Sequence, residues 1–129
     1  MKYLLDTTWV VEYLRGNREV VARVQELQNQ GLAVSIISVA ELYEGVFRSN
    51  NPRGNEAALQ DLLSAVTVLD LTLDICKVYG EEKAKLVKNG SVIGAVDLLI
   101  AATSIYHDLT LLTADHDFER IENLSVTFR

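Results

Sequence analysis

Residues 92–113 read VIGAVDLLIAATSIYHDLTLLT, and the spacing of the apolar residues changes within this run. Residues 94–107 predict a helix, whereas the short apolar run LTLLT at 109–113 predicts a buried strand. A buried strand that follows a helix of this length is typical of a βαβ unit, in which helices connect the parallel strands of one sheet. Asp97 is the only charged residue in the apolar half of this stretch, and it needs an explanation of its own.

The same alternation of short apolar runs and helical patterns extends over the whole chain. It predicts an α/β fold in three layers, with a central parallel sheet of four or five strands covered by helices on both faces. The length of 129 residues suits a single domain over 1–129. The further strands are expected at 2–5, 32–37, 66–71 and 124–128, and the further helices at 7–16, 17–30, 38–47, 53–65 and 72–89.

Composition restricts the class of protein. Cys76 is the only cysteine, which excludes an intrachain disulfide and a cysteine-based zinc site and fits a reduced, cytoplasmic setting. The N-terminus MKYLLDTTWVV does not resemble a signal peptide, and the apolar run around Asp97 is too short to span a membrane. The net charge of −6 argues against nonspecific binding to nucleic acid, which requires clustered Lys and Arg.

Acidic residues follow the predicted strands or lie beside them. Asp6 ends the first strand, Glu41 follows the second, and Asp115 follows the strand at 109–113, with Asp117 two residues further on. Asp97 lies near the start of the helix that precedes that strand. Ligands in open α/β sheets bind beyond the carboxyl ends of the strands, so we expect these acids to meet at one edge of the sheet.

Each acid also has a purely structural interpretation. Asp6 or Thr7 would cap the first helix, and Ser38 with Glu41 has the spacing of a capping box. Asp115 would be an ordinary turn aspartate. Asp97 is the hardest to explain in this way, because a buried carboxylate without a partner costs several kcal/mol.

If the four acids converge, oxygen-only coordination favours Mg²⁺ or Mn²⁺. Zinc is disfavoured, because His107 and His116 lack ligand-like spacing, and His116 is interpreted as a loop residue. A carboxylate-held Mg²⁺ suits the hydrolysis of phosphodiester bonds. The basic residues Arg15, Arg48 and Lys77 would either hold a nucleic-acid backbone or simply be solvated, and Glu81 with Lys85 predicts an ion pair on an exposed helix face.

The chain resembles the PIN-domain family, and specifically the VapC-type toxins of type II toxin–antitoxin pairs. The resemblance rests on four ordered strings: YLLDTT at 3–8, ISVAELYEG at 37–45, IGAVDLLIAAT at 93–103 and LLTADHDFERI at 111–121. It implies a PIN-like three-layer fold and an endoribonuclease that depends on Mg²⁺ or Mn²⁺ and inhibits translation and growth.

Residue by residue, the resemblance implies that the acids Asp6, Glu41, Asp97 and Asp115 are catalytic and bind the metal ion. Thr7 and Thr113 match positions of supporting hydroxyl groups, and Asp117 occupies a position that varies in the family. The family also implies a homodimer and a VapB-type antitoxin whose C-terminal part lies in a groove near the acids. Four aromatic residues occur on the two helices nearest this groove: Trp9, Tyr13, Tyr43 and Phe47.

Two other functions are compatible with the residues. One is a metal-dependent phosphohydrolase that acts on DNA or on a small phosphoester. The other is a non-catalytic module whose acids bind a basic partner peptide.

Overall fold

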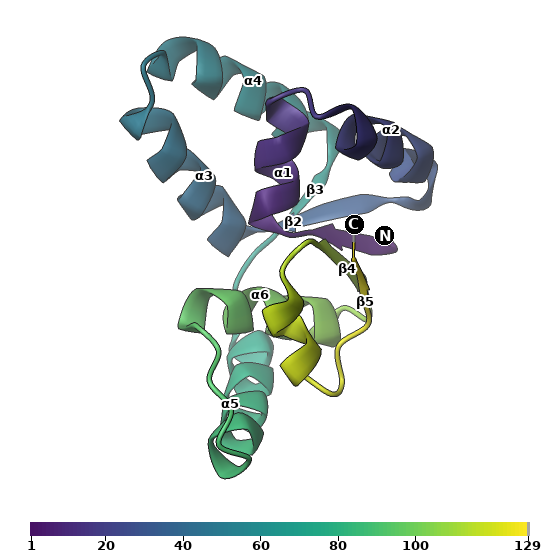
Figure 1. Cartoon of the computed structure of the whole chain (residues 1–129), viewed down its shortest axis with the longest axis vertical. Helices are drawn as coiled ribbons and strands as arrows, with labels where there is room; N and C mark the ends of the chain where they lie inside the picture. Colours follow the sequence, from purple (N-terminus) through teal and green to yellow (C-terminus); the bar gives the residue numbers. More distant parts are fainter. Residues whose placement is uncertain (129) are drawn as a thin grey trace.

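A five-stranded, all-parallel sheet forms the centre of the protein (Figure 1). The computed structural model describes residues 1–128, so Arg129, which the expected domain over 1–129 includes, lies outside the described residues. The strand order is β3-β2-β1-β4-β5, which confirms the predicted α/β fold with a parallel sheet. The strands are β1 (Tyr3–Leu5), β2 (Leu32–Ser35), β3 (Thr67–Leu69), β4 (Thr110–Thr113) and β5 (Val126–Phe128).

Helices cover both faces of this sheet (Figure 1). Four of them pack on one face: α1 (Thr7–Leu14), α2 (Arg18–Leu27), α3 (Ile36–Arg48) and α4 (Pro52–Ala65). Two pack on the other face: α5 (Leu73–Lys88) and α6 (Ala95–Tyr106). Residues 1–128 also include two short 3₁₀ helices, η1 (Gln28–Gln30) and η2 (His116–Arg120). Within residues 1–128, none of the helices combines the length and apolar character that crossing a bilayer requires.

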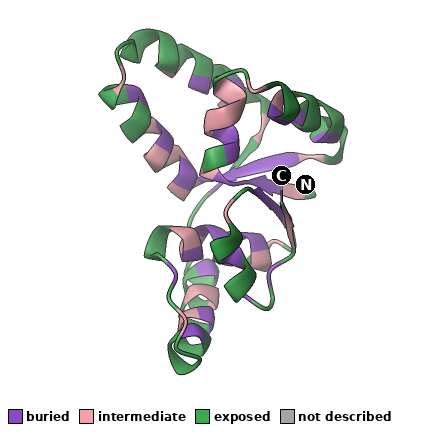
Figure 2. Ribbon diagram, in the orientation of Figure 1, coloured by how far each residue is buried: buried purple, intermediate pink, exposed green. Residues whose placement is uncertain are grey.

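Neighbouring strand residues supply two separate cores. Leu4 and Leu111 pack toward α5 and α6, whereas Leu5 and Leu112 pack toward α1 to α4. Successive side chains of a strand point to opposite faces, so a continuous apolar run fits a strand that is covered on both sides. Figure 2 shows the strands buried in the middle and the outer surfaces of the helices exposed.

Several predicted boundaries were wrong. The strand expected at 32–37 ends at Ser35, because the Ser35 hydroxyl accepts a hydrogen bond from the Ile37 amide and caps α3 there. The helix expected at 17–30 is α-helical only to Leu27 and ends in η1. The strands expected at 66–71 and 124–128 are shorter, at Thr67–Leu69 and Val126–Phe128.

The strand order reverses between β1 and β4. β1 lies in the middle, with β2 and β3 on one side of it and β4 and β5 on the other. The connections out of β1 and β4 therefore run in opposite directions from their carboxyl ends, where open α/β sheets bind their ligands. The Asp6 amide donates a hydrogen bond to the Leu112 carbonyl at 3.0 Å, which holds the start of the β1–α1 connection against β4.

Candidate active site

Asp6 occupies the centre of the candidate site. It directly follows β1, caps α1 and is 3% exposed. Its Oδ1 accepts a hydrogen bond from the Thr7 amide at 2.8 Å, and its Oδ2 accepts from the hydroxyls of Thr113 at 2.7 Å and Thr8 at 3.1 Å. The capping role and the site role are therefore compatible, and Thr8 is a contact that the sequence reasoning did not predict.

Burial is the main cause of a raised pKa at Asp6. Its three hydrogen bonds oppose this effect by stabilising the charged form, and the nearby charge of Asp115 adds to it. A carboxylate offers about four acceptor positions, of which these bonds use three. Oδ1 therefore keeps an acceptor position for a further donor or a cation.

Glu41 reaches the site from the second turn of α3. Its Oε1 accepts a hydrogen bond from the Thr7 hydroxyl at 2.6 Å, and Ser38 Oγ lies 2.8 Å from the same Thr7 oxygen. The capping-box interpretation of Ser38 and Glu41 was wrong, because the helix begins at Ile36 and its cap is Ser35. Ser38 and Glu41 instead share one face of α3, as residues three apart do, and that face is turned toward the start of α1.

Asp97 lies in the first turn of α6 and is half-buried. Its pKa is raised to about 6, first by burial and then by the charges of Asp6, Asp115, Glu41 and Asp117, in that order. Those four residues come from three other segments of the chain, so acids that are distant in the sequence lie near enough to Asp97 for their charges to act on it.

Asp115 and Asp117 lie in the connection that follows β4. Asp115 caps η2, and its Oδ1 accepts from the Asp117 amide at 2.9 Å. The Asp115 amide donates to Thr113 Oγ1 at 3.0 Å, which ties this connection to Asp6 through the Thr113 hydroxyl. Asp117 is exposed and pairs with Arg120 at 3.5 Å.

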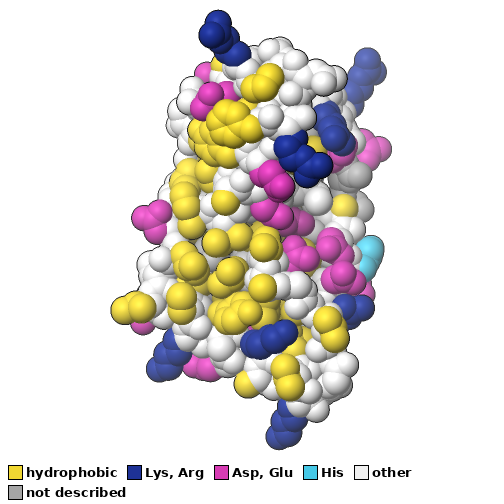
Figure 3. All heavy atoms as spheres, turned by 90° about the vertical axis from the view of Figure 1, so that its left-hand side faces the viewer, with side chains coloured by type: hydrophobic (Ala, Val, Ile, Leu, Met, Phe, Trp, Pro, Cys, Tyr) yellow, Lys and Arg dark blue, Asp and Glu magenta, His cyan; other side chains and the backbone are white. Residues whose placement is uncertain are grey.

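A group of acidic side chains lies near the middle of one face of the molecule. Figure 3 shows Asp and Glu side chains in a band near the middle of one face, next to a broad hydrophobic area. Within residues 1–128, no Lys or Arg side chain forms an ion pair with Asp6, Glu41, Asp97 or Asp115. The negative charges of these four residues are therefore not balanced by a basic side chain of the described chain.

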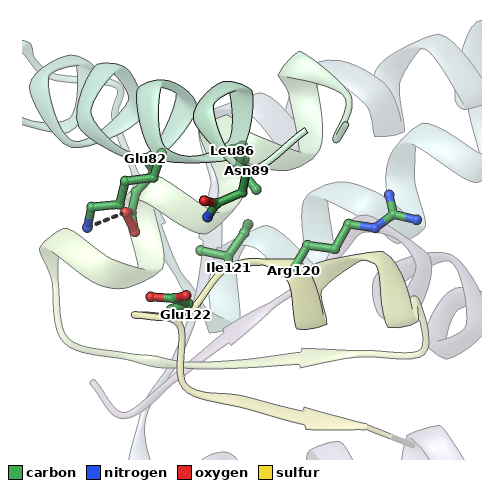
Figure 4. Close-up of a pocket in the computed structure, with 7 residues that line it drawn as sticks. Glu82, Leu86, Asn89, Arg120, Ile121 and Glu122 are labelled. Carbon is green, nitrogen blue, oxygen red and sulfur yellow. Dashed lines mark ion pairs between the residues drawn. The ribbon is translucent and has the colours of Figure 1, made fainter. Parts of the chain in front are cut away.

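Glu82 is another buried acid of this protein, but it has a basic partner. Glu82 on α5 is 4% exposed, and it pairs with Lys85 at 3.1 Å and accepts a hydrogen bond from Asn123 at 3.2 Å (Figure 4). The prediction of a Glu81–Lys85 pair was therefore wrong, because Lys85 turns to the buried Glu82. Among residues 1–128 the fold thus supplies a basic partner to the structural carboxylate of Glu82, but no Lys or Arg pairs with Asp6, Glu41, Asp97 or Asp115.

The donor chemistry of the site fits a hard divalent cation. The side chains offered are carboxylates and hydroxyls, which Mg²⁺ and Mn²⁺ prefer. Within residues 1–128, no three Asp, Glu, His or Cys side chains are arranged closely enough to ligate one ion as they stand. Mg²⁺ keeps several of its waters in such sites, so a set of carboxylates that reaches the ion partly through water is compatible with it.

A cavity of about 310 Å³ opens beside Glu41, between α1, α3 and α4. Its walls are mainly apolar, with Val11, Leu42 and Val46 among them, and Arg15 lies at its edge. Its place between α1 and α3 matches the groove expected near the acids, although the four aromatic residues do not line it.

Those aromatic residues have separate environments. Trp9 is buried in the core, and its indole N–H has no hydrogen-bond partner among the described residues. Tyr13 and Tyr43 are half-buried, and Tyr43 stacks on the exposed Phe47 with ring centroids 6.1 Å apart. Phe47 is 66% exposed, so it is the one of the four aromatic residues that does not pack into the core.

The basic residues named from the sequence are at the surface. Arg15 pairs with Glu12 at 3.6 Å and Arg48 with Glu44 at 3.6 Å, and both arginines are exposed, as is Lys77. Exposed pairs of this kind contribute little to stability and leave the arginines accessible.

The profile of the PIN domain family matches residues 3–124, which include every acid of the site. This chain belongs to the PIN domain family. Its five-stranded parallel sheet is thus the sheet of a PIN domain.

Individual relatives place this PIN domain in the VapC group. It is 39% identical to Ribonuclease VapC2 of Haemophilus influenzae over 94% of this chain and 92% of that protein. It is 35% identical to Ribonuclease VapC2 of Rickettsia felis over 96% of this chain and 95% of that protein. One chain of a solved structure superposes on this PIN domain with a TM-score of 0.93 at 32% identity. The superposition covers 99% of this PIN domain and 98% of that chain. The structure is the crystal structure of VapBC2 from Rickettsia felis bound to a DNA fragment from their promoter.

Proposed function

We propose that this PIN domain is a divalent-metal-dependent endoribonuclease toxin that is neutralised by a VapB-type antitoxin. One observation carries the proposal, which is that acids from distant segments gather around Asp97, most of them without a basic partner among the described residues. The charges of Asp6, Glu41, Asp115 and Asp117 raise the pKa of Asp97. No described Lys or Arg pairs with Asp6, Glu41, Asp97 or Asp115. Such a cluster is unfavourable in a folded protein unless a cation belongs to it. The ribonuclease names of the relatives at 35–39% identity support RNA as the substrate.

In this proposal Asp6 and Asp97 hold the principal ion, and Glu41 and Asp115 complete or extend its ligand set. Mg²⁺ is the proposed ion, with Mn²⁺ as its substitute. When bound, the ion would polarise the phosphate and lower the pKa of the attacking water. Thr113 holds Asp6 through its hydroxyl, Thr7 holds Glu41 in the same way, and Asp117 orders the connection that carries Asp115.

The negative net charge does not exclude RNA as the substrate. A bound divalent ion supplies positive charge where the scissile phosphate must lie, and the exposed Arg15 borders the cavity next to Glu41. We infer that the cavity between α1, α3 and α4 receives the C-terminal part of the antitoxin, since a peptide there would lie directly beside Glu41. We further propose a homodimer of single-domain subunits that acts in the cytoplasm, where translation takes place.

The test is cleavage of RNA by the purified chain with Mn²⁺ or Mg²⁺ and with EDTA. Asp6→Asn and Asp97→Asn should each reduce cleavage by at least about 100-fold, the scale of losing one strongly interacting catalytic group. Asp61→Asn is the matched control, because Asp61 is exposed on α4 and is not among the acids whose charges act on Asp97. Cleavage that persists in EDTA, or in both site variants, would rule the proposal out.

A substrate panel under the same metal conditions separates the other functions. Turnover of DNA or of a small phosphoester, with RNA left intact, would indicate a different phosphohydrolase. Binding of a basic peptide without metal and without turnover would indicate a non-catalytic module.

A further inference from the structure

Ser38 is buried at the junction of the two helices that carry Thr7 and Glu41. It is 0% exposed and is the third residue of α3, whereas Thr7 is the first residue of α1. A serine inside a helix commonly bonds to the carbonyl four residues earlier. Among residues 1–128, Thr7 Oγ1 is instead the only hydrogen-bond partner of Ser38 Oγ, at 2.8 Å.

Counting the hydroxyl protons determines the direction of these bonds. Thr7 Oγ1 carries one hydrogen and lies within bonding distance of both Ser38 Oγ and Glu41 Oε1. An ionised carboxylate only accepts, so the bond of 2.6 Å to Glu41 requires the Thr7 hydrogen. The bond between Thr7 and Ser38 then has to use the Ser38 hydrogen, with Ser38 as the donor.

We propose that Ser38 is a positioning residue that acts on Glu41 through Thr7. The Ser38 hydroxyl donates to Thr7 Oγ1, which fixes the rotation of the Thr7 hydroxyl so that its hydrogen points at Glu41 Oε1. Consecutive hydrogen bonds polarise one another, so the bond to Glu41 is also strengthened. The relay Ser38–Thr7–Glu41 occupies Oε1 and leaves Oε2 available for a cation.

This role rests on the proposed function of Glu41 as a metal ligand. Residues that orient a ligand typically change metal affinity by about 10- to 100-fold when they are removed. Ser38→Ala removes the donor without adding bulk, and alanine favours a helix, so the variant should fold. We expect Ser38→Ala to weaken the binding of Mn²⁺ by about tenfold, at the lower end of that range because Ser38 acts through Thr7.

A Mn²⁺ titration tests the predicted loss of affinity without relying on activity. The electron paramagnetic resonance signal of the free ion measures how much Mn²⁺ is bound at each point. Ser104→Ala is the matched control: Ser104 is also 0% exposed and helical, but its hydroxyl donates to the Leu109 carbonyl. Ser38→Thr keeps the hydroxyl and should bind Mn²⁺ more tightly than Ser38→Ala. The full-length chain is used throughout.

A double-mutant cycle with Glu41→Gln decides whether the effect passes through Glu41. If it does, Ser38→Ala causes no further loss of Mn²⁺ affinity in the Glu41→Gln background. Wild-type affinity in Ser38→Ala, or the same tenfold loss in both backgrounds, overturns the relay while the metal site stands. Wild-type affinity in Glu41→Gln removes Glu41 from the metal site and the relay with it.

Discussion

Thr113 Oγ1 donates a hydrogen bond of 2.7 Å to Asp6 Oδ2, although the two residues are 107 positions apart in the sequence. The same hydroxyl oxygen accepts from the Asp115 amide at 3.0 Å. Thr113 therefore fixes a buried carboxylate at the end of β1 and, at the same time, the connection that follows β4. The position of Asp6 thus depends on both ends of the chain.

Replacing Thr113 by valine keeps its shape and removes both bonds. We expect Thr113→Val to lower the free energy of unfolding by about 1–3 kcal/mol, because Asp6 remains buried with one donor fewer. Urea denaturation in EDTA measures this change. Thr103→Val is the control, since among residues 1–128 the buried Thr103 hydroxyl bonds only to the Leu99 carbonyl of its own helix. Equal effects of the two substitutions would contradict the role of Thr113.

The raised pKa of Asp97 makes stability depend on pH in a direction opposite to that of most carboxylates. With a pKa of about 6 in the folded state against 3.8 as its ordinary value, Asp97 binds a proton more tightly when folded. Its contribution to stability is therefore lost as the pH rises from about 4 to about 6. In EDTA, Asp97→Asn should melt at a higher temperature than wild type above pH 6.

Melting curves at a series of pH values check this sign. The difference in melting temperature between Asp97→Asn and wild type should increase between pH 4 and pH 6, whereas Asp61→Asn should follow wild type at every pH. A difference that is constant over this range would mean that Asp97 does not titrate there.

Divalent metal should stabilise the folded protein. An ion that binds only the folded state stabilises it by mass action, by about 2.7 kcal/mol at a concentration 100 times its Kd, and here it also relieves repulsion among the acids. We expect millimolar Mn²⁺ or Mg²⁺ to raise the melting temperature of wild type by several degrees. Asp97→Asn should lose this shift. An equal shift in that variant would locate the ion elsewhere.

Glu82 provides a carboxylate whose role is structural. Glu82→Ala removes the partner of Lys85 and of Asn123, so it should cost about 1–3 kcal/mol of unfolding free energy. Glu81→Ala, at an exposed neighbouring position, should change stability little. RNA cleavage and the metal-induced shift in melting temperature should be retained in both variants. Loss of the metal response in Glu82→Ala alone would connect α5 to the site.

The helices and strands followed from patterns that are local in the sequence. Leu4 and Leu5 lie in a short apolar run, and such a run buried on both faces is typical of a parallel strand. Boundaries were less predictable: Ile36 and Ile37 read as strand, but the Ser35 hydroxyl begins a helix before them. Whether such residues extend the strand or begin a helix depends on the tertiary packing around them, which the sequence pattern does not show.

The sequence by itself determined the α/β class and the parallel sheet, and it showed which acids directly follow strands, because these features depend on hydrophobic period and on position along the chain. Only the tertiary structure decided which hydroxyl holds which acid. Ser38 reads as a helix cap in the sequence and Glu81 as the partner of Lys85, yet Ser38 contacts Thr7 and Lys85 contacts Glu82. Hydrogen bonds and ion pairs act over about 3 Å, so spacing along the sequence leaves several partners open, and the packing of the helices decides which of them meet.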